Sequence, residues 1–311
     1  MILLTGATGT VGHALLPMLL EQGEEVRVLV RDPRRLGRHR VEVRLALGDL
    51  AELRDPHLQR QALRGVDTVI HLAAAIRDQP RAPVEELNGL ATARLLRAAE
   101  AMGVERFVFF SALGASEFQR TRFFRAKALA EKAVLSSSLA VTVFAPSIVY
   151  DPHDPWVTLM RRLALLPVMP ISGSGQARYQ PIWARDVARC VGAALADSDA
   201  PQRIELAGPE ALSYDQIAKT IARSTGRERP LLHVPLGLVR FGLVWLRRLV
   251  GDTAFATWEE AELMEVPMIT PRADADARAL GVEPQPLADV LSGAPAAQGV
   301  QTASPPAAFA E

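Results

Sequence analysis

Cysteine is almost absent from this chain, whose 311 residues include only Cys190. A single thiol cannot form an internal disulfide or build a cysteine-based zinc site. A surplus of charge is missing as well, because 35 basic side chains balance 35 acidic ones. A nucleic-acid-binding protein would show a basic excess, so we expect no nucleic-acid partner.

Long hydrophobic runs are also missing. No stretch reaches the length of a spanning helix, about 20 uninterrupted apolar residues. The nearest approach is residues 234–250, which Arg240, Arg247 and Arg248 interrupt. The first residues lack the charged and apolar regions of a signal peptide. We therefore expect a cytoplasmic protein without a transmembrane segment. Two interpretations remain for residues 234–250: a helix that covers a substrate cleft, or a helix in peripheral contact with a membrane.

Lysine and tyrosine are scarce. Of the 35 cationic residues only three are lysines, Lys127, Lys132 and Lys219, and the chain has three tyrosines. A chain that uses arginine almost everywhere nevertheless places a lysine at position 127. This choice favours a role for a compact ammonium group there, as distinct from a planar guanidinium.

Hydrophobic residues, by contrast, make up 49% of the chain and can form a sizeable core. In the first half, short apolar runs alternate with longer stretches of helical periodicity. The apolar runs cover residues 2–4, 26–30, 68–73, 106–111 and 141–145, and the helical patterns cover 11–22, 85–102 and 127–135. This alternation predicts an α/β fold with a Rossmann-type, doubly wound parallel sheet.

The pattern changes after Pro146. Prolines and glycines become frequent, and helices are predicted over residues 156–166, 186–196 and 213–225, with one more strand over 203–207. We expect a Rossmann domain over residues 1–150, completed by about 179–207. Residues 151–178 and 208–291 should form a smaller, mostly helical lobe that covers a cleft. Residues 292–311 are rich in Ala, Pro, Gly, Ser and Gln, which predicts a disordered tail.

Three glycines spaced G-x-x-G-x-x-G follow the first predicted strand. Glycine permits a tight turn, lets backbone amides approach a pyrophosphate, and lets a helix pack closely on a strand. The helix N-terminus then faces the phosphates with its dipole. We therefore expect a dinucleotide to bind here, at Gly6, Thr8, Gly9, Thr10, Val11 and Gly12.

The end of the second predicted strand should select the cofactor. Arg31 stands there and is followed by Asp32, Arg34 and Arg35. An acidic residue near this place binds the ribose 2′-hydroxyl of NAD, whereas arginine accommodates the 2′-phosphate of NADP. We expect NADP as the cofactor, bound through Arg31 and Arg34, with NAD as the alternative because of Asp32.

These motifs resemble those of the extended and atypical short-chain dehydrogenase/reductases. NmrA-like proteins and the NAD(P)H-binding accessory subunit of respiratory complex I are similar in pattern, and the resemblance covers roughly residues 1–291. The matching segments include TGATGTVG at 5–12, VRVLVRDP at 26–33, GDL at 48–50, VIHLAA at 69–74, FVFFSALGAS at 107–116 and APSIVYDP at 145–152. The resemblance implies further cofactor contacts from Asp49, Leu50, Ala73, Ala74, Asn88, Lys127, Pro146, Ser147 and Ile148, the last three near the nicotinamide.

The catalytic pattern of that superfamily is incomplete here. Active members carry Tyr-x-x-x-Lys on one helix face and a Ser or Thr after the preceding strand, and the lysine lowers the pKa of the phenol that transfers the proton. In this chain Lys127 is present, but Phe123 stands at the tyrosine position. Ser111 is followed by Ala112 and Leu113 instead of further hydroxyls. The ordinary proton transfer should therefore be lost.

Two functional interpretations follow. The first is a cofactor-binding protein that senses redox state or assists assembly of a protein partner, with weak or non-standard oxidoreductase activity. The second is an NADP-dependent reductase, epimerase or isomerase of a small carbonyl, quinone or sugar nucleotide, with Tyr150 or Tyr179 as proton donor. We expect no metal site, because Asp151, His153 and Asp154 are more typical of a loop turn than of a metal-ligand set. His71 is expected in the core.

Overall fold

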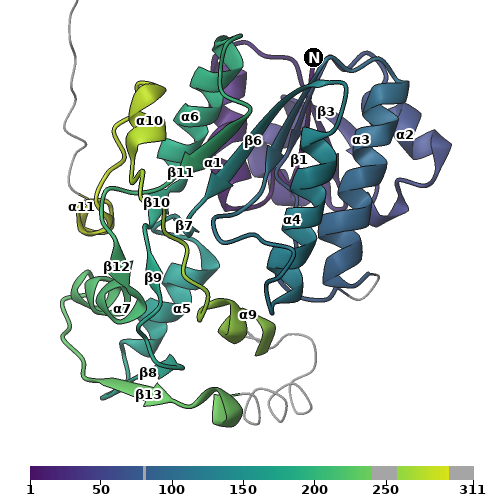
Figure 1. Cartoon of the computed structure of the whole chain (residues 1–311). Helices are drawn as coiled ribbons and strands as arrows, with labels where there is room; N and C mark the ends of the chain where they lie inside the picture. The colour runs from purple at the N-terminus through teal and green to yellow at the C-terminus, as the bar shows by residue number, and fades with distance from the viewer. Residues whose placement is uncertain (80–81, 240–257, 294–311) are drawn as a thin grey trace, which may run out of the picture.

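The computed structural model describes residues 1–79, 82–239 and 258–293. Within them a seven-stranded sheet forms the centre of the molecule, and all of its neighbouring strands run parallel (Figure 1). Its order, β11-β6-β5-β4-β1-β2-β3, is the 3-2-1-4-5-6 order of dinucleotide-binding sheets with β11 added at one edge. The strands are β1 (Ile2–Thr5), β2 (Val26–Val30), β3 (Arg44–Leu47), β4 (Thr68–His71), β5 (Arg106–Phe110), β6 (Ala140–Pro146) and β11 (Arg203–Leu206). The predicted Rossmann fold is confirmed.

Helices cover both faces of this sheet, which explains why its strands are continuously apolar. Successive residues alternate between two cores: Leu4 packs in the core on one face, and Leu3 packs in the core on the other. The first face is covered by α1 (Thr10–Glu21) and α6 (Ala184–Ala196). The second is covered by α2 (Pro56–Leu63), α3 (Ala91–Ala101) and α4 (Arg122–Leu135). A π-helical turn, η3 (Glu86–Leu90), leads into α3, and together they match the predicted helix over 85–102.

A smaller lobe lies against the lower end of the sheet in Figure 1. Its core gathers apolar side chains such as Tyr150, Met160, Tyr179 and Ile217. Its helices are α5 (Pro155–Leu163), α7 (Tyr214–Arg223), α9 (Trp258–Leu263) and α11 (Leu287–Ser292). Three strand pairs, which the sequence patterns did not predict, join them: β7 (Val149–Tyr150) with β10 (Ile182–Trp183), β8 (Met169–Ser172) with β13 (Leu231–Val234), and β9 (Arg178–Tyr179) with β12 (Leu212–Ser213). The helix α10 (Ala275–Ala279), which the sequence placed in the small lobe, instead packs on β11 of the central sheet, where Ala277 joins the core.

Several predicted boundaries can be compared with the structure. Ser213 and Gln216 form a reciprocal capping box at the start of α7, as their spacing indicates. The segment predicted as one helix over 234–250 begins with the end of β13 and a helical turn at 236–239, and the remainder lies outside the described residues. Residues 294–311 of the predicted tail also lie outside them. No helix in the described part of the chain is long and apolar enough to cross a membrane.

Candidate cofactor site

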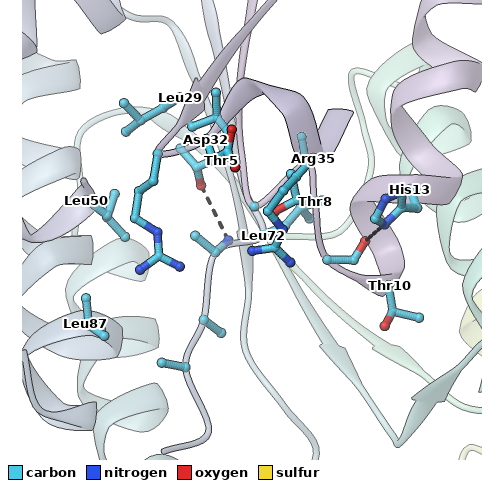
Figure 2. Close-up of a pocket in the computed structure, with 18 of the residues that line it drawn as sticks. Thr5, Thr8, Thr10, His13, Leu29, Asp32, Arg35, Leu50, Leu72 and Leu87 are labelled. Carbon is cyan, nitrogen blue, oxygen red and sulfur yellow. Dashed lines mark hydrogen bonds between the residues drawn. The ribbon is translucent and has the colours of Figure 1, made fainter. Parts of the chain in front are cut away.

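A cavity of about 1260 Å³ opens at the carboxyl ends of β1, β2, β3 and β4. At this edge the chain progresses outward from β1 to β3 on one side and from β4 to β6 on the other. Doubly wound sheets bind dinucleotides at the point where this order reverses. Four segments line most of the wall: the glycine turn, the ends of β2 and β3, and the chain that follows β4 (Figure 2). Of the residues predicted to bind the cofactor, nine line this cavity: Gly6, Thr8, Gly9, Thr10, Arg31, Asp49, Leu50, Ala73 and Ala74.

The three glycines of the turn have different structural roles. Gly6 has φ +76°, and a Cβ there would lie 2.6 Å from the Ala73 backbone nitrogen. A Cβ on Gly12 would lie 2.4 Å from the Gly6 carbonyl oxygen, so both positions need glycine for the fold itself. Gly9 differs, because its Cβ would meet only the Gly6 oxygen, at 3.3 Å. Gly9 is the N-cap of α1 without a side-chain cap, so amides at this helix start remain available to an anion.

The end of β2 presents two guanidinium groups to the cavity. Arg31 and Arg35 line the wall, whereas Arg34 does not. The Asp32 carboxylate accepts a hydrogen bond from the Arg34 backbone N–H at 3.0 Å, which starts a short 3₁₀ segment and turns the chain there. Arg31 is 59% exposed and lies 3.7 Å from the Asp49 carboxylate, a pairing too solvated to hold it firmly. Arg31 therefore remains free to bind a phosphate.

The cavity wall after β4 is held by a buried chain of hydrogen bonds. Thr5 Oγ1 accepts from the Ala73 N–H at 3.4 Å and donates its own hydrogen to His71 Nδ1 at 2.6 Å. His71 Nε2 then donates to Thr92 Oγ1 at 2.9 Å, and Thr92 donates to the Asn88 carbonyl at 2.9 Å. Burial and the nearby Lys127 lower the pKa of His71 to about 3, so the ring is neutral. His71 is thus a core residue that holds the wall, as expected.

Asn88 completes this support without lining the cavity. Its amide is fully buried, accepts from the Ala75 N–H at 3.1 Å and donates to the Ala75 carbonyl at 2.7 Å. The predicted contact of Asn88 with the cofactor is therefore replaced in the structure by a contact with the backbone of the cavity wall.

The three residues expected for catalysis do not line the cavity. Lys127 is 2% exposed, donates from Nζ to the Phe110 carbonyl at 2.6 Å, and lies 4.9 Å from the centre of the Phe109 ring. Ser111 donates its hydroxyl hydrogen to Glu131. Phe123 packs against Phe124, with ring centres 5.3 Å apart. Neither the ammonium nor the hydroxyl of this set faces the cavity.

Burial gives Lys127 a pH-dependent effect on stability. Burial lowers its pKa from 10.5 to about 7, while Glu131 opposes the shift. The unfolded chain therefore binds one more proton than the folded chain between about pH 7 and 10.5, so this group makes stability rise with pH across that window. We expect Lys127→Met to stabilise the protein by about 2–3 kcal/mol more at pH 7 than at pH 9.5. Urea unfolding at both pH values measures this, with exposed Lys132→Met as the control. Equal effects of Lys127→Met at the two pH values would contradict the assignment.

Residues 263–270, which we call the strap, cover the ends of β5 and β6. Leu263 and Val266 pack with Ala112 and Phe124, and Met268 packs with Leu113. The strap also carries polar anchors: Ser147 Oγ donates to the Met268 carbonyl at 2.7 Å, Tyr179 Oη donates to the Met264 carbonyl at 2.5 Å, and the Thr270 N–H donates to Gln180 Oε1 at 2.7 Å. Consequently Pro146 and Ser147 are buried and Ile148 partly so, and none of the three lines the cavity.

The alternative proton donors are also enclosed. Tyr150 and Tyr179 are fully buried, burial raises the pKa of both phenols, and neither lines the cavity. Asp154 caps α5 by accepting from the Val157 N–H at 2.7 Å, and Asp151 accepts from the His153 N–H at 3.0 Å. These two carboxylates therefore shape a turn, and in the described part of the chain no group of acids, histidines and cysteine could hold a metal ion.

Sequence reasoning missed several residues of the wall. Arg77 and Gln79 continue the chain after β4, beyond the segment in which an apolar pattern could identify them. Arg185 comes from the first turn of α6, more than 100 positions away, so nothing local connects it with the glycine turn. His13 lines the same cavity, and so do Asp151, His153 and Asp154, the polar loop residues already identified from the sequence.

The fold and the glycine turn together define a nucleotide-binding protein of the short-chain dehydrogenase/reductase type. The chain belongs to the NAD(P)H-binding family, whose model matches residues 6–198. A nicotinamide dinucleotide is therefore its cofactor.

Known relatives are diverse in role. The chain is 30% identical over 228 residues to subunit 9 of the NADH dehydrogenase [ubiquinone] 1 alpha subcomplex from Arabidopsis thaliana, a match covering 69% of this chain and 55% of the relative. The chain thus spans about half the length of that relative. It is 31% identical over 263 residues to sterol demethylase protein B of Methylococcus capsulatus, covering 76% and 78% of the two chains.

A solved structure extends the likeness. The UDP-glucose 4-epimerase of Thermus thermophilus, in complex with NAD, superimposes with a TM-score of 0.70. The match covers 94% of this chain and 96% of the epimerase at 19% identity, which shows the shared fold.

Proposed function

We propose that this chain binds NADPH at the glycine turn and serves as a cofactor-dependent sensor or assembly protein, with weak or no turnover. One observation carries this proposal: the residues expected for proton transfer are absent or turned away from the cavity. Phe123 has no proton to give, the Lys127 ammonium is directed at the Phe110 carbonyl, and the Ser111 hydroxyl is directed at Glu131. A bound nicotinamide would meet none of these groups.

The strap supports the same proposal. In an active reductase a carbonyl substrate must reach the nicotinamide over the ends of the central strands. Here Leu263, Val266 and Met268 occupy that region with apolar side chains. The similarity to a subunit of a larger respiratory assembly supports a protein partner, and the cytoplasmic location stays a prediction.

A second candidate function is reduction with a histidine as proton donor. His13 and His153 line the cavity, and His13 Nδ1 lies 3.0 Å from the Gly9 carbonyl. A hydrogen bond there leaves Nε2 free to exchange a proton. The similarity to an enzyme named for sterol demethylation supports retaining this alternative.

The choice of NADP over NAD depends on Arg31 and Arg35. We expect Arg31→Ala and Arg35→Ala each to weaken NADPH binding about tenfold and to change NADH binding less than about twofold, because an arginine–phosphate contact contributes about 1.5–3 kcal/mol. Arg34→Ala is the matched control, since Arg34 is adjacent but does not line the cavity. Calorimetric titration of both cofactors into the three variants measures this. Equal losses for NADH and NADPH would point to NAD as the natural cofactor.

A further inference from the structure

A dinucleotide needs two adjoining half-sites on a doubly wound sheet. The glycine turn binds the pyrophosphate and the ends of β2 and β3 bind the adenosine part, so the second nucleotide lies over the ends of β4, β5 and β6. The cavity provides the first half-site in full, through Arg31, Asp49 and Leu50. Over the second half it is lined by the chain after β4, by residues 151 and 153–155 beyond β7 and by Arg185, whereas residues 111–116 after β5 and 147–148 after β6 do not line it.

The strap accounts for this asymmetry. After β5, Ala112 and Leu113 are 5% and 4% exposed because Val266 and Met268 cover them. A Cβ on Gly114 would lie 3.0 Å from the Pro267 carbonyl oxygen, which shows how closely the strap approaches this loop. After β6, the Ser147 hydroxyl is already used by the Met268 carbonyl. The strap therefore covers the ends of β5 and β6, the part of the second half-site that the cavity does not reach.

We infer that the strap acts as an internal ligand, which occupies the nicotinamide half-site of the free protein and leaves that site only when the nicotinamide end of the cofactor enters. The ADP-ribose part of the cofactor then binds to the cavity with the strap in place, and only the nicotinamide ring requires the region that the strap covers. This inference rests on the proposed NADPH binding.

The anchors of the strap suit a reversible contact. Its hold consists of five hydrogen bonds with the small lobe and the end of β6, one of them from the Ser174 N–H to Glu265 Oε1, together with apolar contacts of moderate size. Thr270, at its end, also donates its hydroxyl hydrogen to Glu205 of β11. Displacement of the strap would therefore alter a contact between the small lobe and the edge of the central sheet, which could report cofactor occupancy to a partner.

A comparison of two ligands tests the inference. NADPH and 2′-phospho-ADP-ribose differ only in the nicotinamide ring, and both are titrated into the full chain by calorimetry. Because displacing the strap offsets the contacts that the ring gains, we expect the two dissociation constants to agree within about threefold. A fragment that binds more than threefold more weakly than NADPH overturns the inference and leaves the proposed function standing. Failure of both ligands to bind overturns the proposed function as well.

Two variants loosen the strap. Val266→Ser weakens its apolar contact, and Tyr179→Phe removes the hydrogen bond to the Met264 carbonyl with little risk to folding. We expect each to raise NADPH affinity at least fivefold and to leave fragment affinity within twofold. Val290→Ser, a comparably buried position of the small lobe on α11, is the control. Unchanged NADPH affinity in Tyr179→Phe, or an equal gain in the control, overturns the inference.

The hydrogen-exchange rates of the strap's backbone amides measure directly whether the strap is in place. The Met268 N–H donates to the Arg178 carbonyl at 2.9 Å and the Thr270 N–H to Gln180, so both amides should exchange slowly in the free protein. We expect saturating NADPH to accelerate exchange over residues 263–270, while 2′-phospho-ADP-ribose leaves it unchanged. Unchanged or slower exchange with NADPH overturns the inference.

Discussion

Gly9→Val should reduce NADPH affinity about 100-fold or more while the protein remains folded. Gly9 is the only glycine of the turn whose added side chain would not collide with backbone closer than 3 Å. The valine methyl groups would instead project where the pyrophosphate meets the amides at the start of α1. Loss of these charge-assisted contacts costs about 3 kcal/mol. Calorimetry with NADPH measures the affinity, and circular dichroism verifies the fold.

The control for this variant is Gly237→Val. Gly237 also has an ordinary φ, an added Cβ there would meet nothing within 4 Å, and it does not line the cavity. We expect its NADPH affinity to stay within twofold of wild type. A folded Gly9→Val protein with undiminished affinity would show that the cofactor binds elsewhere.

Oxidation of NADPH by the wild-type protein should be at least about 100-fold slower than by an active short-chain reductase assayed beside it. A missing general acid costs 10²–10⁴-fold in rate. We expect Phe123→Tyr alone to change this little, within about threefold, because the Lys127 ammonium that would activate the phenol donates to the Phe110 carbonyl. Absorbance at 340 nm with aldehyde, quinone and sugar-nucleotide substrates measures both proteins.

The same assay separates the two candidate functions. Wild-type turnover comparable with the reductase would contradict the sensor proposal and favour a histidine donor. His13→Gln and His153→Gln would then be compared, and the donor would be the one whose loss lowers kcat without weakening NADPH binding. Slow turnover in all variants supports the sensor proposal.

The fold could be predicted from the sequence because its signals are local. Apolar runs such as 26–30 and the glycine turn at Gly6 to Gly12 are each read within a dozen residues, and their order along the chain determines the sheet. For the same reason the adenosine end of the site could be predicted from the sequence, since Arg31 directly follows β2 and Asp49 follows β3.

The other half of the site depends on contacts between distant residues. Ser147 and Met268 are 121 positions apart, so no pattern in the sequence indicates that the strap closes the end of β6. The direction of the Lys127 side chain is likewise a result of packing, because the same helix register permits it to face either a ribose or the Phe110 carbonyl. The sequence also could not distinguish between adjacent arginines. Whether Arg34 or Arg35 faces the cavity depends on the turn that Asp32 caps.

The most direct test of the account is a calorimetric titration of NADPH into the purified full-length chain. We expect saturable binding of one NADPH per chain, with NADH binding at least about tenfold more weakly because it lacks the phosphate for Arg31 and Arg35. Absence of saturable heat with either cofactor at millimolar concentration would contradict it.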